Sequence, residues 1–173
     1  MTPGLHKFAL TAHVITSVGW FGAVAGFLVL AVAGLMHADP QVVRACYIAM
    51  GLTGWFAIVP LSLASLLTGI VMSLGTTWGL FRHYWVAVKI VMTLPAIALP
   101  LLHMQPISRM AGAAAQTTLS PADLSALRVQ LVAYAGAALL VLLVATALST
   151  SKPRGWTPYG WRKQHEQRTA SQL

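Results

Sequence analysis

The chain has 173 residues, of which 57% are hydrophobic and only 8% are charged. A soluble domain carries about 25% charged residues, so the composition excludes an ordinary soluble globular protein and predicts a membrane protein. The net charge is +8, but the apolar runs leave no soluble domain to bind nucleic acid, and we expect no such partner. The single cysteine, Cys46, excludes an intramolecular disulfide and a cysteine-based metal cage.

Four apolar runs are long enough to cross a bilayer, which takes about 20 helical residues. They cover approximately 8–35, 43–74, 84–102 and 127–148. Because short connections make consecutive helices antiparallel neighbours, we predict an all-α fold. It is an integral membrane four-helix up-and-down bundle over residues 1–151.

The connections carry helix-start signals. Asp39 and Pro40 in the "HADPQ" turn end one helix and begin the next. Ser120 followed by Pro121 is a typical N-cap and first helical residue, so the fourth helix is expected to begin near Pro121. Pro60, inside the second run, removes a backbone hydrogen bond and predicts a local kink.

Charge predicts the orientation of the bundle. A basic tail over 152–173 directly follows the fourth run and contains Lys152, Arg154, Arg162, Lys163 and Arg168. Juxtamembrane basic clusters favour the cytoplasmic side, so the C-terminus is predicted to be cytoplasmic. Four spans then place the N-terminus on the same side, in agreement with Lys7.

The histidines are distributed unevenly over the runs. His13 and His37 bracket the first run, and His83 and His103 bracket the third, whereas the second and fourth contain none. An ionisable group inside a membrane span is a functional candidate. Because no Asp or Glu lies inside the runs, the pattern favours metal or haem ligation over proton pumping.

Helix geometry sorts these histidines into two levels. At 1.5 Å per residue, His13 and His37 are about 36 Å apart and His83 and His103 about 30 Å apart, so each site must combine the first and third spans. The level pairs are His13 with His83 and His37 with His103, giving one or two haem sites. His13 and His103 are the best single candidates for iron ligands, and the partner of His13 stays open between His83 and His103.

Basic side chains near both ends of the spans could neutralise haem propionates. They are Lys89 and Arg82 on the inner side and Arg44 and Arg128 on the outer side. The same placement also fits snorkelling to the interface.

A copper site is the alternative interpretation of the outer level. Met36 precedes His37 and Met104 follows His103, and both pairs lie at the outer face under the predicted topology. Thioether and imidazole together suit copper, although methionine is also a common apolar filler.

Two segments resemble a known family. The stretch "AHVITSVGWFGAVAGFLVL" is similar to the first span of the CopD/HemJ group of bacterial membrane proteins, and "HYWVAVKIVMTLPAIALPLLH" is similar to its third span. The matching positions are His13, Trp20, Lys89 and His103, with His37 also resembling a HemJ position. HemJ-type proteins bind b-type haem and oxidise protoporphyrinogen, whereas CopD-type proteins handle copper. The resemblance implies a multi-pass protein of the bacterial plasma membrane.

These observations together predict a membrane b-type cytochrome. Haem b, in one or two copies, would be held by histidines of the first and third spans and would serve electron transfer or small-molecule oxidoreductase chemistry with a quinone or another redox partner. A copper-handling protein and a cofactor-free accessory subunit are the alternatives. Small residues on the first and fourth spans permit a homodimer without requiring one.

Overall fold

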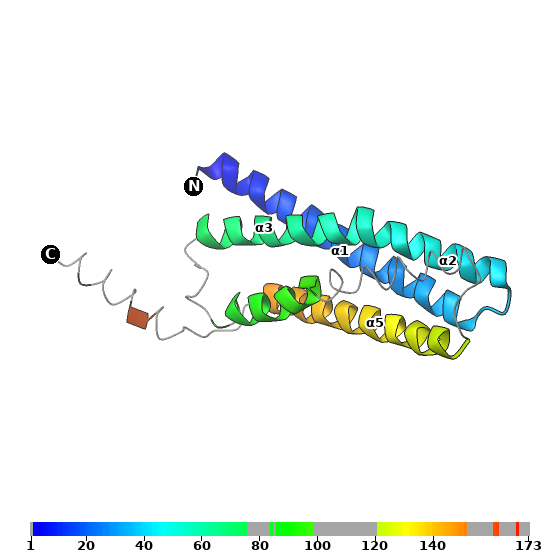
Figure 1. Cartoon of the computed structure of the whole chain (residues 1–173). Coiled ribbons are helices and arrows are strands. Elements are labelled where there is room, and N and C mark those ends of the chain that lie inside the picture. The colour runs from blue at the N-terminus through cyan, green and yellow to red at the C-terminus, as the bar shows by residue number, and fades with distance from the viewer. Residues whose placement is uncertain are drawn as a thin grey trace.

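The computed structural model describes residues 2–75, 84, 86–98, 121–151, 161–162 and 169, with side chains in the last long helix from Arg128 onward. Within these ranges the extended elements are all helical. They are α1 (Pro3–Met36), α2 (Pro40–Thr53), the π turn η1 (Gly54–Ile58), α3 (Val59–Gly75), α5 (Pro121–Ser151) and the shorter helix Val86–Ala98 (Figure 1).

The helix-start signals in the sequence are confirmed. The Asp39 side chain caps α2 by accepting a hydrogen bond from the backbone N–H of Gln41 at 2.9 Å, and Pro40 is the first residue of that helix. Helix α5 begins at Pro121, as predicted. These local signals fix the turn that reverses the chain between α1 and α2.

The disruption predicted at Pro60 takes the form of a π turn. In η1 the backbone N–H of Val59 donates to the carbonyl of Gly54, a spacing of five residues instead of four. Proline lacks an N–H, and its ring collides with the preceding turn of a regular α-helix. The wider turn accommodates Pro60, and α2, η1 and α3 follow one another as one helical rod (Figure 1).

Three helical stretches are long and apolar enough to cross a membrane. They are Pro3–Met36, Pro40–Gly75 and Arg128–Ser151, and they contain the predicted spans 8–35 and 43–74 and nearly all of 127–148. The described part of the chain is therefore helical, and the protein is a multi-pass membrane protein. The helix Val86–Ala98 is shorter, and because residues 99–102 lie outside the described residues, the fourth crossing stays a prediction.

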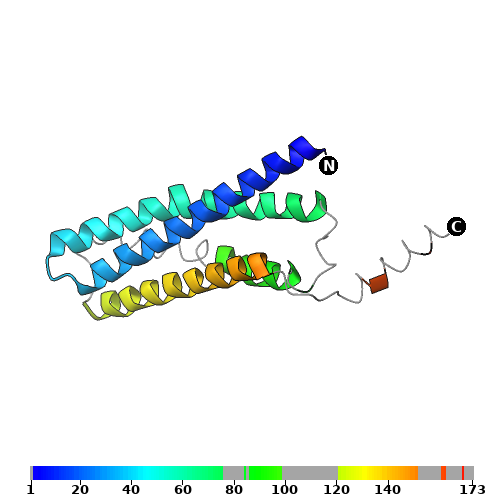
Figure 2. The same cartoon turned by 180° about the vertical axis from the view of Figure 1, so that it is seen from behind.

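Helix α1 is the centre of the bundle. It packs against α2, η1, α3 and α5, and both views show it crossing the α2–α3 rod, lying between α2 and α5 near the turn and beyond α3 at its N-terminus (Figures 1 and 2). Helix α1 begins at the end of the bundle where α3 and α5 finish, which we call the N-terminal end. The opposite end, where α1 turns into α2 and α5 begins, is called the turn end.

The interior and the outer surface of the bundle are both apolar. The buried core joins α1, α2, η1, the helix Val86–Ala98 and α5, and α3 packs partly buried side chains against it. The buried residues include Trp20, Val24, Phe27, Val43, Tyr47, Met50, Ile58, Ala96, Ile97, Leu131, Ala135 and Leu142. Large side chains such as Phe8 and Phe56, which are 72% and 78% exposed, point away from it. Exposed apolar side chains on every long helix suit a lipid environment, in which buried and outward surfaces are equally apolar.

One close helix contact gives a direct test of this packing. A Cβ atom on Gly34 of α1 would lie 3.2 Å from the ring of Tyr47, whereas a Cβ on Gly26 of the same helix would meet nothing within 4 Å. We expect Gly34→Val to destabilise the protein by about 1–3 kcal/mol, the usual cost of overpacking, and Gly26→Val to leave stability nearly unchanged. Unfolding in mild detergent measures both, and equal effects would contradict the packing.

Candidate functional site

His13, the strongest ligand candidate in the sequence, is anchored to the second membrane rod. Its Nδ1 atom lies 3.1 Å from the backbone oxygen of Ser65 and 3.1 Å from the hydroxyl of Thr68. Both partners belong to α3, so the histidine joins α1 to α3 near the N-terminal end of the bundle.

These partners determine which ring nitrogen carries the proton. The carbonyl of Ser65 can only accept a hydrogen bond, and the Thr68 hydroxyl already donates to the carbonyl of Ala64 at 2.7 Å. His13 Nδ1 must therefore be the donor. Its Nε2 atom has no hydrogen-bond partner among the described residues, and in the neutral ring it presents a lone pair.

The backbone of α3 makes room for the imidazole. A Cβ on Gly69 would lie only 3.1 Å from His13 Cε1, a separation tighter than a normal carbon–carbon contact, so the absence of a side chain at Gly69 allows the ring to approach. His13 also shares a seven-residue spacing with Trp20, Phe27 and Gly34. Residues seven apart occupy one face of a helix, and this face of α1 is turned into the bundle.

More hydroxyl groups reinforce the contact between α1 and α3. The Ser17 and Ser65 hydroxyls lie 2.8 Å apart, and those of Thr16 and Thr68 are 3.5 Å apart. Sequence reasoning missed these residues. The available signal was the run of small and polar residues Ser62, Ser65, Thr68 and Gly69 at three- and four-residue spacing in an otherwise apolar span, a pattern that favours close helix contact in membranes.

Lys89 brings the remaining helices into the same layer. Its ammonium group donates to the Ser149 hydroxyl of α5 at 2.6 Å, and Ser149 in turn donates to the carbonyl of Ala145 at 2.8 Å. Lys89 is partly buried.

We call the residues at this level the polar layer. It consists of His13, Thr16, Ser17, Ser65, Thr68, Lys89 and Ser149. Its members from α1 and α3 bond to one another, and Lys89 separately bonds the helix Val86–Ala98 to α5, so a shared site of the first and third predicted spans stays a prediction.

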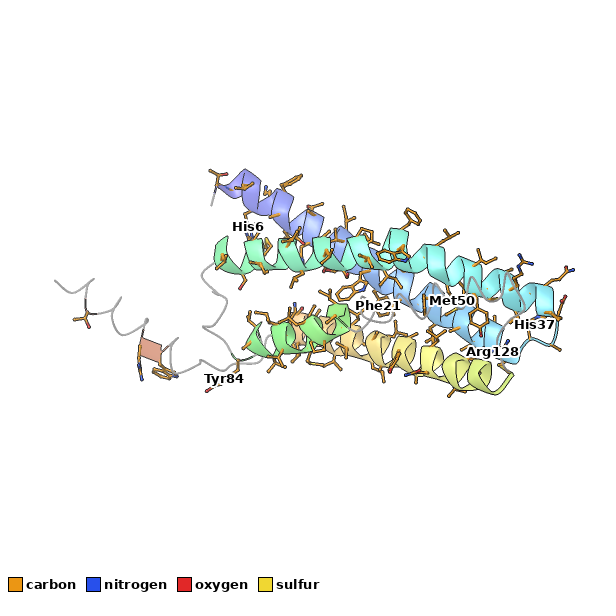
Figure 3. All side chains as sticks on the ribbon, in the orientation of Figure 1. His6, Phe21, His37, Met50, Tyr84 and Arg128 are labelled. Atoms are coloured by element: carbon orange, nitrogen blue, oxygen red, sulfur yellow. The ribbon has the colours of Figure 1, made fainter. Side chains whose placement is uncertain are left out.

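Most of the predicted ligands and propionate partners that the structure describes at the turn end are exposed. Met36 is 79% exposed, and His37 and Arg44 are also exposed. Figure 3 shows His37 at the tip of the turn. Arg128 is partly buried, with its guanidinium carbon 5.7 Å from the centre of the Tyr47 ring. It lies at the opposite end of the bundle from His13, so it can serve only an outer-level site.

Four predicted site residues, Arg82, His83, His103 and Met104, lie outside the described residues. The partner of His13 in a metal site, and the outer pairing of His37 with His103, therefore stay predictions. Among the residues that the structure describes, no three His, Cys, Asp or Glu side chains gather at one point.

The fold and the polar layer together define a class: a multi-pass helical membrane protein with a histidine and a lysine held inside the bundle. No protein-family model matches the chain, and neither a curated protein nor a solved structure matches it. The function must therefore be argued from the site.

The hydrogen bond between His13 and Thr68 can be measured by a double-mutant cycle. We expect His13→Ala and Thr68→Val to be non-additive, with a coupling of about 0.6 kcal/mol and no more than about 2 kcal/mol, as for other hydrogen bonds between membrane helices. Unfolding of the single and double variants in mixed micelles measures the coupling. Strict additivity would mean that the two side chains do not interact.

Proposed function

We propose that the chain is a b-type cytochrome of the bacterial plasma membrane with His13 as an axial haem ligand through Nε2. The observation that carries the proposal is the anchoring of His13 Nδ1 by Ser65 and Thr68. Histidines that bind metals commonly donate their other ring N–H to a carbonyl, a carboxylate or water, which fixes the tautomer and the ring orientation. His13 has this arrangement.

The donor set of the polar layer fits haem b. A neutral imidazole supplies the iron ligand, and Lys89 supplies a positive charge at the same depth. No carboxylate occurs in the predicted spans, so a propionate would provide the missing counter-charge in the interior. Ser149 holds the lysine side chain in place. When bound, haem would supply one-electron redox chemistry, and the protein would set its ligand, its surroundings and its access.

The second axial ligand is proposed to come from the third span. His83 is at the level of His13 under the predicted topology, whereas His103 matches the resemblance to the CopD/HemJ group. Four crossings, with both termini and the basic tail 152–173 in the cytoplasm, complete the proposed arrangement. A quinone or another redox partner is the proposed electron partner, and the bundle is free to form a homodimer.

The burial and hydrogen bonding of the candidate ligands favour haem over copper. Met36 and His37, the described half of the copper alternative, are exposed at the turn end. His13 is partly buried and held by two hydrogen bonds at its Nδ1 atom. Pre-positioning of a ligand by its neighbours is what a metal site requires, and it occurs here at His13.

An optical spectrum of the purified protein tests the proposal. We expect a Soret band, with α and β bands on reduction, in the wild-type protein and in His6→Ala. His6 is the matched control because it lies on the same helix, seven residues before His13 (Figure 3). His13→Ala should lose at least nine-tenths of the Soret absorbance per protein because an axial ligand is removed.

Three results would contradict the proposal. An unchanged Soret band in His13→Ala would exclude His13 as a ligand. A colourless wild-type protein that contains stoichiometric copper would favour the copper alternative, and a protein with neither haem nor copper after expression with ample haem precursor would favour an accessory subunit. Far-ultraviolet circular dichroism checks that each variant keeps its helices.

A further inference from the structure

A second polar contact lies at the turn end, where the proposed haem site does not reach. Arg128 of α5 directly precedes an uncharged run over 129–151, and its guanidinium lies over the ring of Tyr47 from α2. The Tyr47 ring packs against Gly34 of α1. Gly34 is 21 residues after His13, which corresponds to about 31 Å along the helix, so the two sites are separate.

Two donors in this contact lack partners. The Nε atom of Arg128 and the hydroxyl of Tyr47 are both buried without a hydrogen bond, and Tyr47 is only 3% exposed. Buried polar groups in proteins are almost always hydrogen-bonded, and an exception requires an explanation such as an ion or ligand. Both groups can donate, and the Arg128 guanidinium is positively charged, so the partner that suits them best is an acceptor with negative charge.

The protein itself supplies no such acceptor among the side chains that the structure describes. Asp39 is the one carboxylate in that set, and it is exposed and engaged with the backbone of Gln41. An uncharged, mostly apolar run over 129–151 follows Arg128 directly in the sequence, which suits a position of Arg128 at the depth where lipid phosphates meet the hydrocarbon. The neighbouring residues Val129 and Ile48 are 56% and 40% exposed and provide apolar surface on which acyl chains can lie.

We propose that Arg128 and Tyr47 bind the phosphate of an anionic phospholipid at the turn end of the bundle. A guanidinium binds phosphate oxygens through two parallel N–H bonds, and the Tyr47 hydroxyl is the second donor at this contact that lacks a partner. The lipid would connect α2 with α5 around α1. This site is independent of haem, and its test needs no haem readout.

The test counts lipids on the full-length protein by native mass spectrometry in detergent. Phosphatidylglycerol, zwitterionic phosphatidylcholine and inorganic phosphate are the probes. We expect one tightly retained phosphatidylglycerol on the wild-type protein, bound at least tenfold more tightly than phosphatidylcholine. Arg128→Gln should lose that preference, Tyr47→Phe should weaken it severalfold, and Arg44→Gln should keep it because Arg44 is exposed at the same end.

The controls separate the sources of the anion. Equal retention of phosphatidylglycerol by wild type and Arg128→Gln would overturn the proposal, as would equal retention of the two lipids by the wild type. Competition by millimolar inorganic phosphate would show that the site takes a free anion and would overturn the lipid assignment. If Arg128→Gln does not fold, Arg128→Lys keeps the charge but loses the two-pronged contact, and an unreduced preference in this variant would equally overturn the proposal.

Discussion

The hydrogen bond from His13 to the backbone of α3 is the interaction on which the account of this protein depends. It fixes three things together: the rotation of α1 about its axis, the depth at which α1 meets α3, and the nitrogen that remains free. Ser65 and Thr68 hold one side of the ring, and the small size of Gly69 allows the approach. Hydrogen bonds between membrane helices contribute only about 0.6 kcal/mol on average, because the separated helices also find polar partners, so this bond specifies the contact more than it stabilises it.

The bundle has its polar groups at two depths, separated by a mostly apolar middle. The polar layer lies toward the N-terminal end, and the Arg128–Tyr47 contact lies toward the turn end. Between them the core is mostly apolar, with residues such as Val24 and Phe27, although the indole nitrogen of Trp20 is also buried there without a hydrogen bond. In Figure 3, Met50 lies closer to the turn end, near Arg128. The two histidine levels stay a prediction, because His83 and His103 lie outside the described residues, and the polar contact found at the turn end is built from Arg128 and Tyr47.

Much of the fold was predictable because it depends on local chemistry. The lengths of the apolar runs predicted the long helices, and Asp39, Pro40 and Pro121 marked where helices begin. The partners of the site were harder to predict. Ser65 is 52 residues from His13, and Ser149 is 60 residues from Lys89, and no local pattern determines which helix faces which. The seven-residue spacing of His13, Trp20, Phe27 and Gly34 was visible in the sequence and would have identified the inward face of α1. Pro60 predicts that the regular helical hydrogen bonding is interrupted, but it does not determine whether the interruption is a kink or a π turn.

The central claim is that His13 donates through Nδ1 and leaves Nε2 free as a ligand. Nitrogen-15 NMR of histidine-labelled, haem-free protein in micelles measures this directly, with His13→Ala identifying the signals. The account predicts a neutral His13 ring with the proton on Nδ1 and an unprotonated Nε2. A ring protonated on Nε2 alone would contradict it, because the lone pair would then point at Ser65 and no metal could be bound at the proposed atom.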